Sequence, residues 1–339
     1  MMPNVAIIIL NWNGWKDTIE CLESLYQIDY PNYNVIVVDN ASEDDSITKI
    51  KKYCEGEIEV KSDFFEYNKN NKPINIFKFT NEESEKVKII DKKYGNLNSC
   101  EKLILIKNDK NYGFAEGNNI GIRFSLKNLK PDYILLLNND TVVDASFLLE
   151  LVKVGEQNER NGILGPKVYN YYHKDTFQVT KIKLNFNTGK SKLIGLNEKD
   201  YGQYNKILNT DYVPGSCFLI KSSLLEKVPQ LNADYFCYWE EVDFCIRTRK
   251  AGYNCLYVPN AKIWHKISQT SNQYTGFLNY YLTRNMFWFM KKYSNNYNYF
   301  IIYFFICRFL LQLISFSIHK NNFKLIKCYL KGVKDGLIK

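Results

Sequence analysis

The stretch Tyr133-Ile-Leu-Leu-Leu137, followed at once by Asn138-Asn139-Asp140, indicates the fold class of this 339-residue chain. Five apolar residues between Pro131-Asp132 and a polar triplet are typical of a buried strand in a parallel sheet. Ligands of open α/β sheets bind beyond the carboxyl ends of such strands, which is where the triplet falls. A carboxylate flanked by two amides offers oxygen ligands for a hard divalent cation that holds a phosphorylated substrate. The alternative is an ordinary strand-ending turn, because Asn and Asp are common turn residues.

Similar strands lie on both sides of this stretch. Apolar runs at 5–10, 35–38 and 103–106 each end in polar residues, and the sequence after each run predicts a helix. Successive strand–helix units predict an α/β domain with a doubly wound sheet. Further along, the patterns predict a helix over 146–158, a hairpin region over 163–196, a strand near 213–220, a helix over 240–251 that ends at Gly252, short strands at 255–258 and 261–264, and helices beyond 275.

The organisation of the chain is inferred from where this pattern breaks. Residues 55–101 are rich in Lys, Asn and Glu and have only a weak strand signal at 74–79. We therefore expect a peripheral insertion that is partly disordered. The rest of 1–275 is expected to form the main domain, and 276–339 a basic, amphipathic helical appendage.

Charge is distributed unevenly between these parts. The formal net charge is +9, yet from Arg247 onward there are fifteen Lys or Arg and one acidic residue, so that part carries +14 and the preceding residues carry −5. Basic segments bind nucleic acid or anionic lipid headgroups. The apolar stretch 299–318 favours a membrane surface and argues against nucleic acid. Because Arg308 and Gln312 interrupt it, a helix in the membrane plane fits better than a span; alternatively, the tail packs on the main domain.

The cysteines and histidines bear on the compartment and on metal binding. Nine cysteines are scattered without a CxxC pair, which favours reduced thiols in a cytoplasmic protein. Zinc is not expected, because the three histidines, His173, His265 and His319, lie far apart in the sequence. The apolar stretch at 5–10 is too short for a signal peptide and has no basic region before it. We expect a cytoplasmic protein attached peripherally to the inner face of the cell membrane.

Polar residues collect at the predicted strand ends. Each alone is a common turn or cap residue, but the carboxyl ends of parallel strands share one edge, so together they can converge on one ligand. These residues are Asn11, Asn13, Asp39, Asn40, Asn108, Asn138, Asn139 and Asp140. The sequence contains no phosphate-binding glycine fingerprint, since Gly113-Phe-Ala-Glu-Gly117 has the wrong spacing. A nucleotide bound here would need a metal to neutralise its phosphates, which points again to Asp140.

Acidic residues also cluster at the start of the helix predicted over 240–251. Glu240, Glu241 and Asp243 fall in its first turn, where a helix dipole favours negative charge by about 0.3–1 kcal/mol each. Asp243 and Arg247 have the i, i+4 spacing of an ion pair. Glu241 faces away from that pair and remains free, as a general base must be. From the spacing alone, a structural role for these acidic residues is supported at least as well as a catalytic role for Glu241.

His265 follows the last predicted strand. A single histidine is more often structural than functional. A neutral imidazole is nevertheless a good ligand for a transition metal such as manganese.

Taken in order, these segments resemble a known family. The chain is similar to an inverting family-2 glycosyltransferase of the GT-A fold, in the rhamnosyltransferase-like branch of surface polysaccharide assembly. The resemblance covers roughly 5–50 and 103–290. It rests on Val5-Ala-Ile-Ile-Ile-Leu-Asn-Trp-Asn13, Val38-Asp-Asn-Ala-Ser42, Asn111-Tyr-Gly-Phe-Ala-Glu-Gly-Asn-Asn119, Leu137-Asn-Asn-Asp140, Gly215-Ser-Cys-Phe-Leu-Ile220, Glu240-Glu-Val-Asp-Phe-Cys-Ile-Arg247, Gly252-Tyr253, Trp264-His265 and Tyr280-Tyr-Leu-Thr-Arg-Asn285.

The resemblance implies a fold and a set of roles. It implies a Rossmann-like mixed sheet flanked by helices. Asn11 and Asp39 would border the nucleotide base and ribose, with Asn13 and Asn40 beside them, and Asn118 would lie near the donor pocket. Asp140, with Asn138 and Asn139 before it, matches the metal-binding aspartate of the family's DxD-type motif. Glu241 matches the catalytic base, and His265 matches a histidine that can complete a Mn²⁺ or Mg²⁺ site.

The chain departs from the family pattern at two site positions. Asn138 occupies the first DxD position, so the metal has one carboxylate there. The base position usually holds Asp, which leaves Asp243 as an alternative to Glu241. The insertion at 55–101 is also longer than the usual connection.

The function implied is sugar transfer from a nucleotide-diphosphate donor, dTDP-rhamnose or a UDP-hexose, to a hydroxyl of a growing, lipid-linked glycan. The alternatives are a sugar-phosphate nucleotidyltransferase and a non-catalytic nucleotide-sugar-binding protein. The first should show a glycine-rich, basic loop after its first strand, which Asn11-Trp-Asn-Gly14 does not provide.

Overall fold

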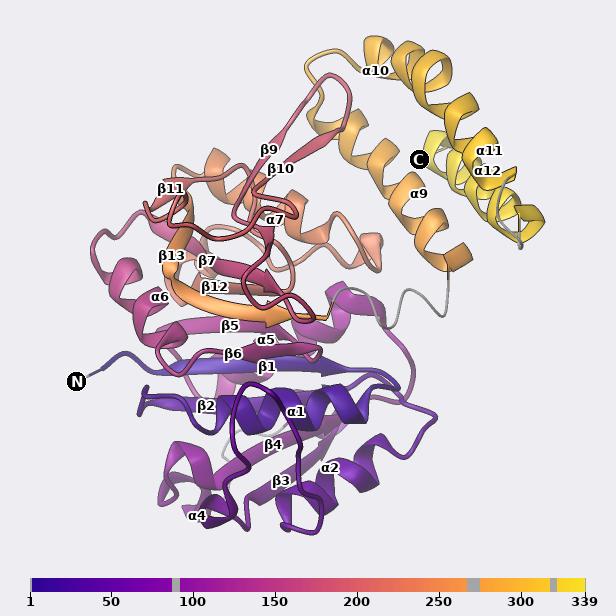
Figure 1. Ribbon diagram of the computed structural model, residues 1–339. Coiled ribbons are helices and arrows are strands. Elements are labelled where there is room, and N and C mark those ends of the chain that lie inside the picture. Colours follow the sequence, from indigo (N-terminus) through magenta and orange to yellow (C-terminus); the bar gives the residue numbers. More distant parts are fainter. Residues whose placement is uncertain (1, 87–91, 267–274, 318–321, 339) are drawn as a thin grey trace.

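A large mixed sheet forms the centre of the molecule in the computed structural model, which describes residues 2–86, 92–266, 275–317 and 322–338 (Figure 1). Eleven strands make up this sheet, and nine of them form a continuous path in the order β11-β13-β7-β12-β5-β1-β2-β4-β3. The other two, β6 and β8, pair with β13 and β7. The C-terminal helices stand to one side of the sheet.

The parallel half of the sheet contains the strands predicted from the apolar runs. They are β1 (Val5–Asn11), β2 (Tyr33–Asp39), β3 (Asn75–Thr80), β4 (Lys102–Lys107) and β5 (Tyr133–Asn138). β1 lies between β2 and β5, with Ile7 opposite both Val35 and Leu135. These residues are fully buried, because parallel strands are covered on both faces and therefore appear as continuous apolar runs.

Amphipathic helices cover the sheet. They are α1 (Trp15–Leu25), α2 (Ser46–Cys54), α5 (Gly113–Asn128) and α6 (Phe147–Glu156). The apolar side chains of α1, Ile19, Leu22 and Leu25, are buried on the sheet side of the helix. α5 packs on β1 and β2, and α6 packs on β7 and β13. The predicted strand–helix alternation is confirmed.

Antiparallel pairing dominates the other half. It contains β6 (Thr141–Val143), β7 (Asn161–Asn170), β8 (Phe177–Val179), β11 (Leu208–Asn209), β12 (Cys217–Lys221) and β13 (Asn254–His265), with the separate hairpin β9 (Lys181–Leu184) and β10 (Ser191–Ile194). The prediction of two short strands before His265 is wrong. β13 is one strand whose register shifts between Val258 and Lys262, because Pro259 cannot donate to the ladder and is accommodated in a bulge.

The region 55–101 contributes to the edge of the sheet. β3 pairs in parallel with β4, as the weak strand signal suggested, and the short helices α3 (Asn81–Lys86) and α4 (Lys92–Gly95) follow it. Val60, Ile74 and Tyr94 of this region are buried in the core. The expected partial disorder is untested at 87–91, which lie outside the described residues. Short 3₁₀ turns occur at Lys69–Asn71, Ser99–Glu101, Ser222–Glu226 and Ala233–Tyr235.

Helices complete the chain. α7 (Glu240–Lys250) ends before Gly252, whose φ of +85° is the expected C-terminal stop. The appendage contains α9 (Thr275–Tyr293), α10 (Tyr297–Tyr303), a π-helical segment (Phe304–Phe309), α11 (Leu310–Ser317) and α12 (Asn322–Ile338). α9 packs along α12. Tyr297–Phe316 is long and apolar enough to cross a membrane, by length and composition alone. Ile318, His319 and Lys320 lie outside the described residues.

Candidate functional site

A cavity of about 310 Å³ lies at the carboxyl ends of β1 and β5, the edge indicated by the polar strand ends. Six of the residues proposed from the sequence line it: Asn40, Asn138, Asn139, Asp140, Glu241 and His265. Five others, Asn11, Asn13, Asp39, Asn118 and Asp243, do not line it. The structure therefore brings the proposed metal ligands and the proposed base to one cavity.

Asp140 and His265 are neighbours although 125 positions separate them in the sequence. Asp140 directly precedes β6, and Thr141 of β6 pairs with His265 at the end of β13. This pairing places Asp140 Oδ1 3.1 Å from His265 Nε2, and Asn138 Nδ2 lies 3.5 Å from the same nitrogen. Burial raises the pKa of Asp140, but His265 and Lys266 lower it more. The pKa of this carboxyl therefore lies below its ordinary value, and the carboxyl stays ionised.

These two side chains have the chemistry of a divalent-cation site. His265 Nδ1 lies 2.9 Å from Gln178 Oε1, and this contact orients the imidazole so that Nε2, the atom that would bind a cation, faces Asp140. Among the described residues there is no group of three or more His, Cys, Asp or Glu that could hold a metal. Asp140 and His265 thus fit a cation whose remaining ligands come from a bound diphosphate and water.

The carboxylates of Glu240 and Glu241 line the other side of the cavity, at the start of α7. Oε2 of each is buried and has no hydrogen-bond partner among the described residues. Burial raises the pKa of Glu241, while backbone hydrogen bonds oppose the rise. Burial raises the pKa of Glu240 well above its ordinary value, and the neighbouring Glu241 adds to the effect. A carboxylate that lines a cavity and keeps one oxygen without a hydrogen-bond partner can accept a proton there.

Asp243 points elsewhere. It is fully buried, and Arg247 Nε donates to Oδ2 at 2.7 Å, which confirms the predicted i, i+4 ion pair. Lys292 Nζ and Tyr293 Oη of α9 donate to Oδ1 at 2.9 and 2.8 Å. Both of its oxygens are therefore occupied: Oδ2 by Arg247 within α7, and Oδ1 in joining α7 to α9.

The ends of β1 and β2 are bound to each other. Asn11 Nδ2 and Ser42 Oγ donate to Asp39 Oδ1 at 2.8 and 2.6 Å. Asn13 donates its backbone N–H to Ser42 Oγ, and its own Oδ1 accepts the backbone N–H of Glu43. This network fixes the loops that border the cavity without lining it.

The remaining asparagines are also hydrogen-bonded. Asn40 Oδ1 accepts Asn108 Nδ2 and the backbone N–H of Tyr112, both at 3.0 Å. Asn139 Nδ2 donates to Thr18 Oγ1 at 3.0 Å. Asn118 Nδ2 donates to the Phe114 carbonyl one turn earlier in α5. These side chains shape the edge of the cavity through their own contacts.

Sequence reasoning missed the aromatic wall of the cavity. Trp12, Phe114, Phe236, Tyr238 and Phe277 line it. The run Tyr235-Phe-Cys-Tyr-Trp239 immediately before Glu240 was the available signal, although aromatic residues are so frequent in this chain that the run did not stand out.

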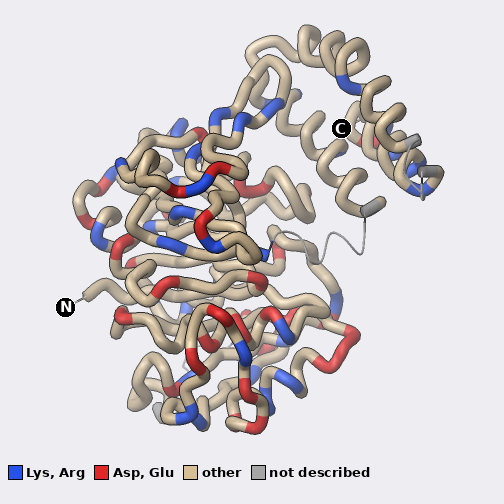
Figure 2. Tube along the Cα trace, in the orientation of Figure 1, with Lys and Arg blue, Asp and Glu red and all other residues tan. Residues whose placement is uncertain are grey.

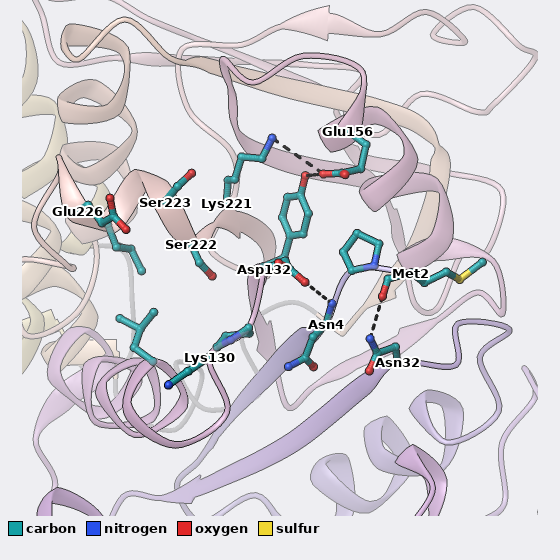
Figure 3. Close-up of a pocket in the computed structure, with 15 residues that line it drawn as sticks. Met2, Asn4, Asn32, Lys130, Asp132, Glu156, Lys221, Ser222, Ser223 and Glu226 are labelled. Atoms are coloured by element: carbon teal, nitrogen blue, oxygen red, sulfur yellow. Dashed lines mark hydrogen bonds and ion pairs between the residues drawn. The ribbon is translucent and has the colours of Figure 1, made fainter. Parts of the chain in front are cut away.

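A larger cavity, of about 800 Å³, lies at the opposite end of β5 (Figure 3). Three of its charged groups are paired: Lys221 with Glu156, and Asp132 with the backbone N–H of Asn4. It faces the amino ends of the parallel strands, where open α/β sheets do not bind their ligands. Its size therefore does not make it the candidate site.

Two family models match the chain. The model described as "Glycosyl transferase family 2" matches residues 6–79, and the one described as "Glycosyltransferase like family 2" matches residues 68–286. The second match alone spans more than half of the chain and includes Asp140, Glu241 and His265.

Among characterised relatives, the chain is similar to the low-salt glycan biosynthesis hexosyltransferase Agl10 of Haloferax volcanii, with 31% identity over 144 residues, 42% of this chain and 45% of Agl10. It is also similar to the rhamnosyltransferase WbbL of Escherichia coli K12, with 28% identity over 155 residues, 44% of this chain and 58% of WbbL. A third relative is the dTDP-rhamnosyl transferase RfbF of Shigella flexneri, with 24% identity over 205 residues, 58% of this chain and 66% of RfbF. The matched parts span less than two thirds of each relative.

Solved structures share the fold. The mannosyltransferase PcManGT from Pyrobaculum calidifontis, in complex with GDP-Man and Mn²⁺, superposes with a TM-score of 0.56 at 12% identity, covering 100% of this chain and 87% of that one. GalNAc-T7 with UDP, GalNAc and Mn²⁺ superposes with a TM-score of 0.54 at 11% identity, covering 93% and 58%. The predicted fold class, a GT-A mixed sheet flanked by helices with a C-terminal helical appendage, is confirmed.

Proposed function

Since the chain belongs to glycosyl transferase family 2, we propose that it transfers a sugar from a nucleotide-diphosphate donor to a hydroxyl of a growing glycan, with inversion at the sugar's C1. The observation that carries this proposal is the cavity lined both by Glu241, whose buried Oε2 has no hydrogen-bond partner among the described residues, and by the Asp140–His265 pair. Such a cavity joins a proton acceptor to a diphosphate-binding edge.

Glu241 is the proposed base. Its carboxylate removes the proton of the acceptor hydroxyl as that oxygen attacks C1 from the face opposite the diphosphate. The new bond joins the acceptor oxygen to C1, the bond from C1 to the donor phosphate oxygen breaks, and the proton ends on Glu241. Burial of Glu241 favours proton uptake because it raises the pKa of the carboxyl.

Asp140 and His265 are the proposed holders of Mn²⁺ or Mg²⁺, with Asn138 beside them. When bound, such a cation offsets the charge that develops on the departing diphosphate. The oriented imidazole of His265 and the ionised carboxyl of Asp140 are the chain's own contribution. The bound Mn²⁺ named for PcManGT and GalNAc-T7 supports a divalent cation here.

The proposed donor is dTDP-rhamnose or a UDP-hexose. Support comes from the relatives, two of which are named as rhamnosyl transferases and one as a hexosyltransferase of glycan biosynthesis. On this proposal, Asn11, Asn13, Asp39, Asn40 and Asn118 border or brace the nucleotide end of the site, and Asn139 supports its metal end. The proposed acceptor is a lipid-linked glycan, since a further relative is named as an N-acetylglucosaminyl-diphospho-decaprenol rhamnosyltransferase.

A screen of nucleotide sugars tests this function. The donor should raise the melting temperature of the full chain in the presence of Mn²⁺, because a ligand that binds only the folded state stabilises it by mass action. The same donor should then yield free nucleotide diphosphate with water or a glycan acceptor. A chain that is stabilised by a donor but never releases its nucleotide diphosphate would instead be a binding protein.

The appendage is the proposed contact with the cytoplasmic face of the membrane. Ile302, Ile306, Leu310 and Ile314 are each more than half exposed and follow at i, i+4 spacing along α10, the π-helical segment and α11. Figure 2 draws these helices almost entirely tan. Arg308, which interrupts the apolar stretch, is turned toward α9 and donates to Met286 Sδ. The exposed apolar stripe formed by these four side chains is therefore not interrupted by the charge of Arg308.

A row of cations accompanies this stripe. Lys324, Lys327, Lys331 and Lys334 are exposed along α12, which packs against α9 and α11. An apolar stripe beside lysines suits a helix lying in the surface of an anionic bilayer. The full chain should float with phosphatidylglycerol vesicles, and Ile306→Asp should weaken flotation, whereas Ile207→Asp, at an exposed apolar site in the main domain, should not. Equal flotation of both variants would contradict this attachment.

A further inference from the structure

The segment that leads into α7 has an unusual backbone. Phe236, Tyr238 and Trp239 have φ of +66°, +66° and +76°, in a region that bulky residues rarely adopt. Phe236 has ψ of −61°, and Cys237 N–H donates to the Tyr235 carbonyl at 2.8 Å, which makes a γ-turn of the strained, positive-φ type. Backbone of this kind costs about 1–3 kcal/mol per residue and persists only where the surroundings hold it.

This strained loop, residues 234–239, forms part of the candidate site. Phe236, Cys237 and Tyr238 line the cavity, and Trp239 is the residue before Glu240 and Glu241. The Phe236 carbonyl accepts the backbone N–H of Ala115 at the start of α5. The strained loop therefore links the beginnings of two helices, and its conformation sets where the Glu241 carboxyl points.

Two adjacent side chains of α9 bind the carbonyls of the strained loop. Asn285 Nδ2 lies 2.8 Å from each of three carbonyl oxygens, those of Tyr235, Cys237 and Tyr238, so its two hydrogens serve three acceptors. Arg284 Nη2 donates to the carbonyls of Asp234 and Tyr235, both at 2.9 Å. Together they bind four of the carbonyls in and beside the turn.

These two side chains are themselves fixed. Asn285 is fully buried and Arg284 nearly so. Arg284 Nε donates to Asn285 Oδ1 at 2.8 Å, which turns the amide so that Nδ2 faces the carbonyls. The guanidinium lies 4.0 Å from the centre of the Trp288 ring and 4.7 Å from that of Tyr281. A buried charge with this many partners is rigid.

We propose that Arg284 and Asn285 are positioning residues for the transfer reaction: they hold the strained loop so that the Glu241 carboxyl stays dry and directed into the cavity. This inference rests on the proposed function. Neither side chain lines the cavity; both act through the backbone of the strained loop. The loop would otherwise relax, because three bulky residues gain by leaving positive φ.

A relaxed loop has two consequences for Glu241. Its position relative to the acceptor hydroxyl changes, which lowers kcat more than it changes KM for the donor. Water also reaches the carboxyl, so the pKa that burial had raised falls back toward the ordinary value. Since the base must be ionised, the acidic limb of the kcat–pH profile moves to lower pH.

Asn285→Asp in the full chain tests this role, because it preserves the shape of the side chain and removes both N–H donors. Backbone amides of the strained loop should exchange faster with deuterium than in the wild type, while those of β1 and β5 should not. With the donor found in the nucleotide-sugar screen, kcat should fall about 10- to 100-fold, KM for the donor should change little, and the acidic limb should shift downward. Arg284→Lys, which keeps the charge, should give a smaller loss.

Phe287→Leu is the matched control. Phe287 is buried on the same helix but packs on Phe300 and Phe304, within the appendage. It should lower the melting temperature without faster exchange in the strained loop or a shift of the pH profile. If Phe287→Leu shifts the profile as Asn285→Asp does, or if Asn285→Asp keeps the wild-type kcat and profile, the positioning role is wrong.

Failure of the proposed function is distinguishable from failure of this inference. If the wild-type chain uses no donor, the proposed function is wrong, and Arg284 and Asn285 have no role in transfer. Hydrogen exchange in Asn285→Asp would still report whether Asn285 holds the strained loop. Unchanged exchange in that variant would overturn the holding itself, whatever the wild type catalyses.

Discussion

The two sides of the cavity are built differently. On the side of the parallel strands, the polar residues that end β1 and β2 bind one another, as Asn11, Asp39 and Ser42 do. On the side of α7, Glu240 and Glu241 each keep a buried oxygen without a partner, behind the strained loop that α9 holds. The polar side chains at the ends of β1 and β2 are thus bound to one another, whereas the α7 side holds two carboxylates with buried oxygens that have no partner among the described residues. Groups of that kind are retained where chemistry uses them.

The largest effect should come from replacing Glu241. Glu241→Gln keeps the size of the side chain but cannot accept the acceptor's proton, so transfer should fall about 10²- to 10⁴-fold. Product formation from the identified donor measures this loss. Glu226→Gln, whose carboxyl is outside the site, should retain activity. Full transfer by the Glu241 variant would remove the assigned base.

The next effect concerns the metal edge on the parallel-strand side. Asp140→Asn should remove the additional thermal stabilisation that Mn²⁺ brings to a bound nucleoside diphosphate, because it removes the anionic ligand beside His265. Transfer should fall with it by about 10²-fold or more. In Asp144→Asn, a change in the turn before α6, the Mn²⁺ effect should persist. An undiminished Mn²⁺ effect in Asp140→Asn would place the cation elsewhere.

A third variant tests whether Asp243, on the α7 side, stabilises the fold or acts as the base. Asp243→Asn leaves Arg247 and Lys292 without their carboxylate, and losing one partner of a buried ion pair costs about 3–5 kcal/mol. Denaturant unfolding should show this loss of stability. Transfer per folded molecule should fall far less than in Glu241→Gln. The reverse order of the two effects would assign the base to Asp243.

Substitutions at two glycines test the close approach of α5 to the strained loop. Gly113 has φ of +80°, and a Cβ there would lie 2.5 Å from the Phe236 carbonyl oxygen, whereas Gly252 has φ of +85° with nothing within 4 Å. Gly252→Ala should cost only the backbone penalty, about 1–2 kcal/mol. Gly113→Ala should cost more and also reduce transfer, since it displaces the strained loop. Equal losses in stability and activity would mean that the contact is unimportant.

The smallest effect is a dependence of stability on pH. Burial raises the pKa of Glu240 in the folded chain. The contribution of the protonated side chain to folding stability is therefore complete below the pKa that Glu240 has in the unfolded chain, and it is lost as pH rises through the folded pKa. Glu240→Gln should therefore melt about 2 °C higher than the wild type at neutral pH, and no higher near pH 4. A difference that is the same at both pH values would contradict the raised pKa.

Much of the fold could be predicted from the sequence because its patterns are local. The run 133–137 and its parallel neighbours are buried on both faces, and a continuous apolar run indicates that directly. β13 was divided in two because Pro259 breaks the local pattern, while pairing with β7 and β6 keeps the strand continuous across it. The continuity of β13 therefore depends on strands that are far away in the sequence, and the local pattern could not indicate it.

The candidate site divides in the same way. Asp140 and Glu241 were found because polar residues after an apolar strand and acidic residues at a helix start are local signals. The ion pair of Asp243 with Arg247 could be predicted from local spacing, whereas its contacts with Lys292 and Tyr293, some fifty positions away, could not. The aromatic wall was missed for a similar reason, since only folding brings Trp12 and Phe277 to one cavity.

By itself, the sequence determined the alternation of strands and helices, the edge at which a ligand is proposed to bind, and the two segments that carry Asp140 and Glu241, because each depends on neighbouring residues. Only the tertiary structure decided which oxygens stay unpartnered, and that His265 meets Asp140 through the pairing of β6 with β13. It also decided that Arg284 and Asn285 hold the strained loop before Glu241. Hydrogen-bond partners and burial are properties of the assembled chain, and local patterns do not contain them.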